Sequence, residues 1–410
     1  MAAVDCAGAD VLRDGRSTGS CPGTLGDGWH GVLTRRVGTS RRRGTHASGG
    51  RGRRQARELE EEVAEQAPGL GATYWLDAGP DSWSGPHTVA ITFTGIRDGG
   101  APATDARDRF ERVEIVEGIL PGSGRISVTV KVEGINPGTW QVTATPVILA
   151  PAGRSGAPGP GPRLQPALQT VPTRLAPLVR GPGVRPFAWP LLVAAGVALA
   201  LLVQGLLAAR AGLDTGAVLS ASLAGSVVGY VTAKAYYMVQ HRQNFRQFVG
   251  AGTCIQGFLL GAFGTALAVV AGLGLPVGTW LDVAAPGAFL AMATARPGCF
   301  LGGCCVGRPT TSRWGLWSSD RRVGIRRVPT QLIEALLALA LGAATLTADL
   351  TWRPAVPGTL FVAAMAAYTL GRQLLFPLRA EARRTKAGRS LTVAATLLVL
   401  LAAFAAPALA

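Results

Sequence analysis

Seven long apolar runs follow one another in the second half of this 410-residue chain. A helix needs about 20 apolar residues to cross a bilayer. Helices also satisfy their own backbone hydrogen bonds where no water is present. The runs therefore predict a mainly α, polytopic membrane bundle of about seven spans. The expected spans cover residues 187–209, 217–239, 253–275, 280–295, 331–346, 356–375 and 391–409.

The first 186 residues have a different composition and fall into three parts. Residues 1–67 are rich in Arg, Gly and Ser, so we expect a disordered basic head,. Residues 68–150 alternate polar and apolar side chains between turn signals such as Asn136-Pro137-Gly138, which predicts a small antiparallel, sandwich-like β module,. Residues 151–186 are rich in Pro and Gly and are predicted to form a linker to a transmembrane domain over 187–410,.

The positive charge of the chain indicates which class of molecule it contacts. The formal net charge is +16, and the basic residues of the second half lie beside apolar spans. Anionic lipid headgroups are the nearest partner for such residues. We therefore expect contact with membrane lipid and no partnership with nucleic acid.

Polar groups inside spans are expensive, so each is a functional candidate. Lys234 and Tyr237 fall on one face of the second span, and Gln256 begins the third,. Lys234 has an alternative reading as a residue that extends to the interface within an aromatic belt. Both readings of Lys234 stay open on the sequence.

The fifth and sixth spans add an acid and two arginines. Glu334 lies about one turn into the fifth span, where we expect a nearby arginine as its partner. Arg372 lies deep in the sixth span, and Arg379 follows two turns later. An arginine at that depth normally faces a cavity or a charged partner.

A glycine-rich loop after the fourth span is the most suggestive motif. Arg296 ends the span, Arg308 follows the glycines, and guanidinium groups bind phosphate oxygens in pairs. The alternative is that these arginines only extend to the interface. Five further arginines lie in the loop: Arg313, Arg321, Arg322, Arg326 and Arg327.

The same loop carries three cysteines: Cys299, Cys304 and Cys305. Thiols can ligate a soft metal or exchange with disulfides. Two of the three are adjacent, and the paired C-x-x-C pattern of zinc sites is missing. Packing at a crowded helix end is therefore the expected role, and we expect neither a metal nor a cofactor.

Several blocks in residues 187–410 occur in an order that is specific to one family. The Tyr-rich second span is followed by the blocks Gln256-Gly257-Phe258, Asp282-Val283-Ala284-Ala285-Pro286, Arg296-x-Gly298-x-Phe300, Gly307-Arg308-Pro309-Thr310, Pro329-Thr330-Gln331-Leu332-x-Glu334 and Tyr368-x-x-Gly371-Arg372. These blocks resemble the bacterial prolipoprotein diacylglyceryl transferases, and the resemblance does not reach the first 186 residues.

This resemblance implies a seven-span enzyme of the bacterial inner membrane. It would transfer a diacylglyceryl group from phosphatidylglycerol to a cysteine thiol of a prolipoprotein, whose signal peptide it would bind. Arg296 and Arg372 would be catalytic and neutralise the charge that grows on the leaving phosphate. The residues expected to bind substrate are Arg296, Arg308, Arg379, Lys234, Tyr237, Gln256 and Glu334.

The chain also departs from the family pattern. Gln256 stands where the family usually has a histidine, Cys299 replaces an asparagine, Cys304 replaces a glutamate and Phe376 replaces a second acid. Two alternatives therefore stay open. One is a catalytically impaired paralogue that binds anionic lipid or a lipoprotein precursor, and the other is a thiol- or metal-dependent membrane protein.

Overall fold

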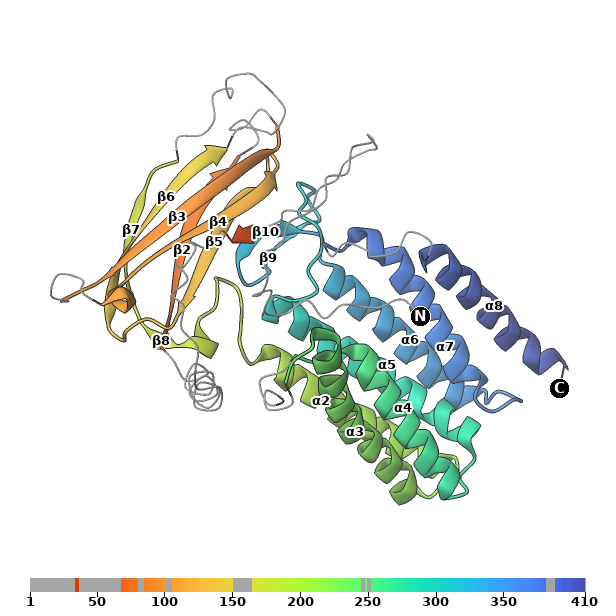
Figure 1. Cartoon of the computed structure of the whole chain (residues 1–410). Coiled ribbons are helices and arrows are strands. Elements are labelled where there is room, and N and C mark those ends of the chain that lie inside the picture. Colours follow the sequence, from red (N-terminus) through yellow and green to blue (C-terminus); the bar gives the residue numbers. More distant parts are fainter. Residues whose placement is uncertain are drawn as a thin grey trace. The chain divides into compact units, whose positions relative to one another are not determined.

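The computed structural model describes residues 34–36, 68–79, 85–99, 105–149, 164–244, 248, 252–380 and 388–409. The chain divides into two compact units (Figure 1). A helical unit contains Trp189–Cys299 and Thr330–Ala410, and a β unit contains Gly26–Ala188 and Phe300–Pro329. Apart from residues 34–36, the predicted basic head over 1–67 lies outside the described residues.

Each predicted span corresponds to a helix. The helices are α2 (Ala188–Arg210), α3 (Thr215–His241), α4 (Ile255–Gly272), α5 (Val277–Gly302), α6 (Thr330–Thr351), α7 (Thr359–Leu375) and α8 (Gly388–Leu409). Within the described residues, six helices are long and apolar enough to cross a membrane, and α5 is not among them. Asp282, Arg296 and two internal prolines lower the mean hydropathy of α5. The predicted bundle of about seven spans is confirmed in its main features.

The helices α3 and α4 pack closely through small residues. A Cβ atom added at Gly257 would lie 2.5 Å from the Thr232 carbonyl oxygen. The Thr232 hydroxyl also donates a hydrogen bond of 2.8 Å to the Gly257 carbonyl. Glycines allow helix backbones to approach closely in a membrane, where hydrophobic burial does not drive helices together. The glycines of α4 therefore have the packing role that their spacing suggests.

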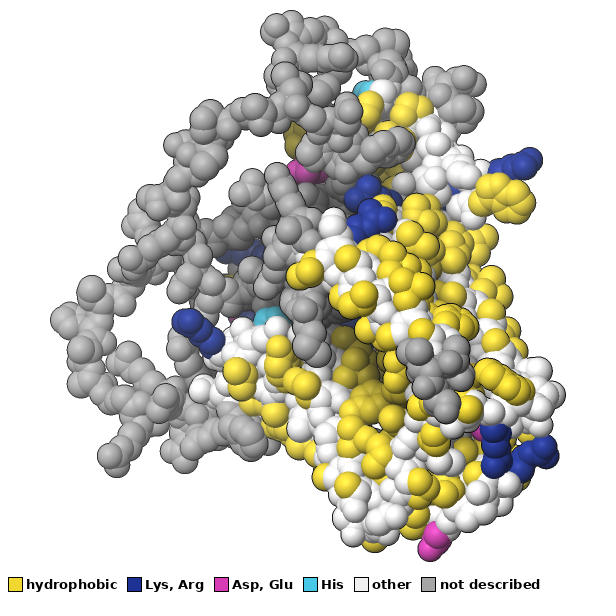
Figure 2. Space-filling view, turned by 90° about the vertical axis from the view of Figure 1, so that its right-hand side faces the viewer, with side chains coloured by type: hydrophobic (Ala, Val, Ile, Leu, Met, Phe, Trp, Pro, Cys, Tyr) yellow, Lys and Arg dark blue, Asp and Glu magenta, His cyan; other side chains and the backbone are white. Residues whose placement is uncertain are grey.

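Apolar side chains remain on the outside of the helical unit. Leu398, Leu401 and Phe404 of α8 are each exposed over two thirds or more of their surface. Figure 2 shows hydrophobic side chains spread over a wide area of one face of the molecule. Large exposed apolar patches are rare on water-soluble monomers. This surface is what a multi-pass membrane protein presents to lipid.

Within the described residues, the β unit consists of two antiparallel five-stranded sheets around one core. One sheet has the order β1-β4-β3-β6-β7 and the other β8-β2-β5-β10-β9. The strands are β1 (Thr34–Arg36), β2 (Pro68–Ala78), β3 (His87–Arg97), β4 (Arg109–Ile119), β5 (Gly124–Glu133), β6 (Thr139–Leu149), β7 (Ala167–Pro172), β8 (Arg174–Leu175), β9 (Leu316–Ser319) and β10 (Val323–Arg327). Inward-facing residues of both sheets, such as Ile91, Val128 and Trp140, are fully buried and form the core,.

The β unit extends beyond the predicted 68–150 module in two places. The strands β7 and β8 lie in the segment predicted as a linker and pair with β6 and β2. The strands β9 and β10 come from the loop after α5, and Val323 pairs with Val128 of β5. These four strands have two to six residues each. Strands this short give a weak signal in the sequence, and β8 and β10 pair with strands that lie far earlier in the chain.

Trp317 of β9 anchors the loop strands to the module. Its ring stacks on Trp75 with centroids 5.9 Å apart. Its indole nitrogen donates a 2.9 Å hydrogen bond to the Arg125 carbonyl, across 192 positions of sequence. A Cβ atom at Gly324 would lie only 2.3 Å from the indole ring, so Gly324 leaves the space that the ring occupies.

Trp317→Ala is expected to loosen β9 and β10 while the rest of the sandwich stays folded. Aromatic pairs contribute about 0.5–1.5 kcal/mol beyond their buried area, so we expect roughly tenfold faster hydrogen exchange in residues 316–327. The matched control is Trp314→Ala, because Trp314 is 75% exposed. Equal exchange rates in the two variants would contradict the anchoring role. Mass spectrometry of exchanged peptides measures both.

Candidate active site

One buried glutamate joins two arginines inside the helical unit. The Glu334 Oε2 atom lies 2.9 Å from Arg296 Nη2, and its Oε1 atom lies 3.1 Å from Arg379 Nη1. The side chains of Glu334 and Arg379 are only 2% and 1% exposed, and that of Arg296 is 14% exposed. The arginine partner expected for Glu334 is thus present twice.

Tyr368 of α7 completes this group. Its hydroxyl accepts a 3.2 Å hydrogen bond from Arg296 Nη2. The Tyr368 ring packs against the fully buried Phe289 of α5, with centroids 5.9 Å apart. We call Arg296, Glu334, Tyr368 and Arg379 the arginine–glutamate cluster. The sequence included Tyr368 in a motif but gave it no role, because its bond to Arg296 depends on how α5 and α7 pack.

Local structure places each member of the cluster. Thr330 begins α6 after Pro329, and Glu334 follows about one turn later. A short 3₁₀ turn, η4 (Phe376–Leu378), ends α7, and the Arg379 amide donates to the Phe376 carbonyl. This turn breaks the helical path just before Arg379. Arg379 is therefore positioned by the end of α7 and not by its helical face.

The cluster gathers guanidinium groups around one carboxylate. Within the described residues, Glu334 is paired with both Arg296 and Arg379. Guanidinium groups are also the side chains that bind phosphate oxygens in pairs. Arg372 lies four residues after Tyr368 and so on the same face of α7. Within the described residues, the half-buried Arg372 takes no part in the bonds of this cluster.

Lys234 and Tyr237 occupy a second polar region near the end of α3. The buried Lys234 Nζ donates a 2.9 Å hydrogen bond to the Phe248 carbonyl and lies 5.7 Å from the centroid of the Tyr230 ring. Tyr237 stacks on His241 with centroids 4.0 Å apart. Lys234 therefore lies in an aromatic, carbonyl-lined setting. These contacts fit the aromatic-belt reading of Lys234 as well as a substrate-binding one.

Gln256 lies in the first turn of α4. Its Oε1 atom is 3.9 Å from the Sγ atom of Cys254, the buried residue that precedes the helix. A glutamine amide donates and accepts hydrogen bonds but does not titrate. Gln256 can therefore orient a bound group but cannot take a proton from it.

Two arginines of the loop after α5, Arg308 and Arg327, have different surroundings. The Arg308 carbonyl accepts a 3.0 Å hydrogen bond from the Val328 amide, which holds the backbone of the predicted headgroup loop. Arg327 is 1% exposed, and its Nη2 atom lies 2.7 Å from Asp320 Oδ2. Burial lowers the pKa of Arg327, and the Asp320 carboxylate opposes this shift. Arg327 is thus a structural residue, although the sequence grouped it with arginines that face lipid.

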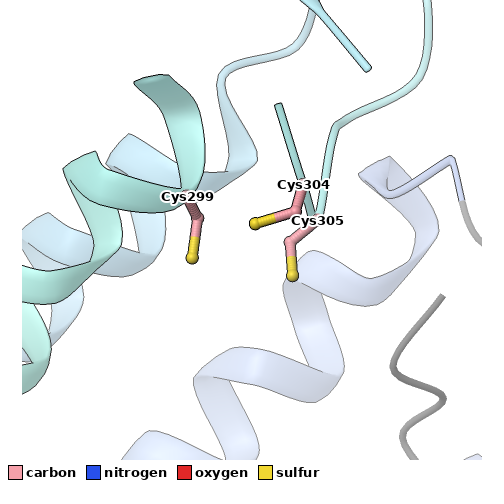
Figure 3. Close-up of side chains that lie close together, drawn as sticks. All are labelled: Cys299, Cys304 and Cys305. Atoms are coloured by element: carbon pink, nitrogen blue, oxygen red, sulfur yellow. The ribbon is translucent and has the colours of Figure 1, made fainter. Parts of the chain in front are cut away.

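The three loop cysteines lie together, as Figure 3 shows. The Sγ atoms of Cys299, Cys304 and Cys305 are all within 4.8 Å of one another. Cys299 is buried at the end of α5, and the other two are half-buried. The sequence predicted packing for these residues and did not predict that all three sulfurs would converge.

Comparison with known proteins identifies relatives of the helical part. The family model for prolipoprotein diacylglyceryl transferase matches residues 183–409. The phosphatidylglycerol--prolipoprotein diacylglyceryl transferase 2 of Clostridium perfringens is 34% identical over 129 residues, which are 30% of this chain and 50% of that protein. The corresponding transferase of Dehalococcoides mccartyi is 29% identical over 166 residues, 38% of this chain and 62% of its own. That of Frankia alni is 28% identical over 215 residues, 47% of this chain and 55% of its own. The chain thus spans about half to three fifths of the length of these relatives.

Proposed function

Because this chain belongs to the prolipoprotein diacylglyceryl transferase family, we propose that it transfers a diacylglyceryl group from phosphatidylglycerol to the lipobox cysteine thiol of prolipoproteins. The observation that carries this proposal is the buried arginine–glutamate cluster, in which Glu334 holds the guanidinium groups of Arg296 and Arg379. The proposed substrate is an anionic lipid, and guanidinium groups bind phosphate oxygens in pairs.

The reaction makes one bond and breaks one. The prolipoprotein thiol loses its proton, and the sulfur attacks the terminal glyceryl carbon of the diacylglyceryl group. A thioether forms while the bond between that carbon and the phosphate oxygen breaks, and glycerophosphate leaves with the electron pair. Charge that develops on the leaving oxygen is stabilised by fixed donors in a site that excludes water. Arg296, aided by Arg372 from the same face of α7 as Tyr368, would supply these donors.

The other cluster members would hold Arg296 in place. Glu334 fixes one edge of the Arg296 guanidinium, and the Tyr368 hydroxyl accepts from the same Nη2 atom. An arginine held by two partners keeps its remaining N–H groups in a defined direction. Arg379 shares Glu334 and would add positive charge for the phosphate. We assign Arg308, Lys234, Tyr237 and Gln256 to substrate binding.

The proton of the attacking thiol needs an acceptor. Both Glu334 oxygens are paired with arginines, so this carboxylate has a positioning role in the cluster. Lys234 is the other titratable candidate from the sequence. General bases contribute about a hundred- to ten-thousand-fold, so we expect turnover slower than that of relatives with a histidine at the position of Gln256.

The departures from the family pattern favour a second candidate function. A chain with glutamine at position 256 and thiols at positions 299 and 304 could bind phosphatidylglycerol or a lipoprotein precursor without converting it. Such a paralogue would use the same cluster for binding. The two functions share a bacterial inner-membrane location and a signal-peptide partner, and they differ in the fate of the thiol.

Complementation distinguishes the two functions. We expect the chain to restore growth of a bacterium depleted of its own diacylglyceryl transferase, and to add the mass of one diacylglyceryl group to a reporter lipoprotein. A reporter whose lipobox cysteine is replaced by serine is the control and should keep its mass. Thermal stabilisation by phosphatidylglycerol with no mass change on the reporter would support the binding paralogue and contradict the transferase.

A further inference from the structure

The three loop thiols form a compact group that the proposed reaction does not use. Cys299 lies in the last turn of α5, and Cys304 and Cys305 follow directly after the helix. All three Sγ atoms lie within 4.8 Å of one another. Figure 3 shows the Cys304 sulfur directed toward Cys299, with the Cys305 sulfur beside them.

The backbone after α5 turns sharply to bring the thiols together. Gly303 has φ +69° and Cys305 has φ +54°, so two residues of this turn are left-handed. A left-handed conformation is uncommon for a residue with a side chain. A Cβ atom at Gly303 would lie 2.8 Å from the Ser319 carbonyl oxygen, so the turn is also tightly packed. Adjacent cysteines usually diverge, and this turn lets Cys304 and Cys305 approach the same sulfur of Cys299.

The spacing of the sulfurs suits one metal ion. Thiolates bind zinc at about 2.3 Å, which places three sulfurs around one ion at about 3.8–4.0 Å from one another. The Sγ atoms, all within 4.8 Å, need only small side-chain rotations to reach that spacing. Thiolate sulfur selects soft ions such as Zn²⁺ and Cu⁺ over hard ones. We propose that Cys299, Cys304 and Cys305 together bind one soft metal ion.

Nearby arginines favour thiolate ligands. The Arg321 Nε atom donates a 3.0 Å hydrogen bond to the Gly302 carbonyl at the end of the same helix. Arg296 lies about one turn before Cys299 on the same helix. Three thiolates and a divalent or monovalent ion carry net negative charge, which these guanidinium groups offset. The metal would fix the turn that follows Arg296, independently of whether the chain transfers a lipid.

Metal titration of the full-length chain tests this proposal. The protein is purified in detergent, reduced, stripped with a chelator and loaded with Zn²⁺ or, without oxygen, Cu⁺. Bound metal is then counted by mass spectrometry after desalting. We expect one ion per chain, with binding at least tenfold weaker in each of Cys299→Ser, Cys304→Ser and Cys305→Ser.

Two control variants separate this group from the other cysteines. Cys254→Ser removes the one described thiol outside the group, and Cys6→Ser/Cys21→Ser removes the two N-terminal ones. Both should keep the ion. Co²⁺ loading gives a second readout, because thiolate ligation produces a charge-transfer absorption. The Cys299→Ser, Cys304→Ser and Cys305→Ser variants should lose this absorption. If Cys299→Ser fails to fold, the half-buried Cys304 and Cys305 variants decide the outcome.

The proposal fails if the reduced wild-type chain binds no more metal than the Cys304→Ser variant. It also fails if the Cys254→Ser variant loses the ion as the Cys299, Cys304 and Cys305 variants do. A disulfide between two of the three cysteines, together with no metal binding after reduction, would identify a redox pair instead. None of these results depends on diacylglyceryl transfer, so they leave the proposed function to its own test.

Discussion

Arg296→Lys should lower kcat/KM for diacylglyceryl transfer at least tenfold, and Arg296→Ala should lower it at least as much. A lysine ammonium cannot reproduce the planar pair of hydrogen bonds that a guanidinium gives to a phosphate. Hydrogen bonds to charged groups contribute about 1.5–3 kcal/mol each, and about 1.4 kcal/mol is a factor of ten in rate. Reporter lipoprotein modification at varied phosphatidylglycerol concentration measures the loss.

The matched control for this variant is Arg210→Lys. Arg210 also lies at the end of a span, but its Nη2 atom donates to the Leu350 carbonyl and not to the cluster. We expect this control to keep its activity. Since Arg296 also pairs with Glu334, thermal unfolding of each variant must be followed in parallel. An Arg296→Ala chain with wild-type turnover would contradict a phosphate-binding role for this residue.

Glu334→Ala should produce the largest loss of stability. Arg296 and Arg379 would lose the one carboxylate that the described structure places between them. Removing one partner of a buried ion pair costs about 3–5 kcal/mol, because the other charge stays buried. The free energy of unfolding in a denaturant titration of the detergent-solubilised chain measures this cost.

A double variant separates the lost ion pair from a simple cavity. Glu334→Leu/Arg379→Met removes the acid and one of the two arginines that pair with it, and the new side chains refill the space. Replacing a buried ion pair with apolar residues is often nearly neutral, so the double variant should be more stable than Glu334→Leu alone. A purely additive loss would contradict electrostatic coupling between Glu334 and Arg379.

The sequence predicted those features that follow from the cost of charge in a membrane. Glu334 one turn into a span demanded a cationic partner, and arginines in the same bundle were the available ones. The spans themselves followed from their length and hydropathy. Tyr368 was different, because a hydroxyl in a helix gives no sign of which neighbour it will bond. Its partner depends on packing between α5 and α7.

Short strands and turns escaped prediction for another reason. The β10 strand has five residues, among them one glycine and two arginines, and pairs with β5 far earlier in the chain. The three cysteines come together in a turn in which Cys305 has a positive φ. No local sequence pattern predicts that conformation for a cysteine. Both features are set by tertiary contacts, which a single sequence does not display.

The pairing of β10 with β5 also requires an even number of membrane crossings between these two strands. Strands of one sheet cannot lie on opposite sides of a bilayer, so the chain must return to its starting side between these two strands. Four helices, α2 to α5, lie between them, and α2, α3 and α4 are each long and apolar enough to cross. Three crossings would place β9 and β10 on the side of the membrane opposite to β5. If α2, α3 and α4 all cross, the sheet requires α5 to cross as well, although α5 is not among the six helices that are long and apolar enough by themselves. Crossings by α6, α7 and α8 would then leave the C-terminal end on the other side of the membrane.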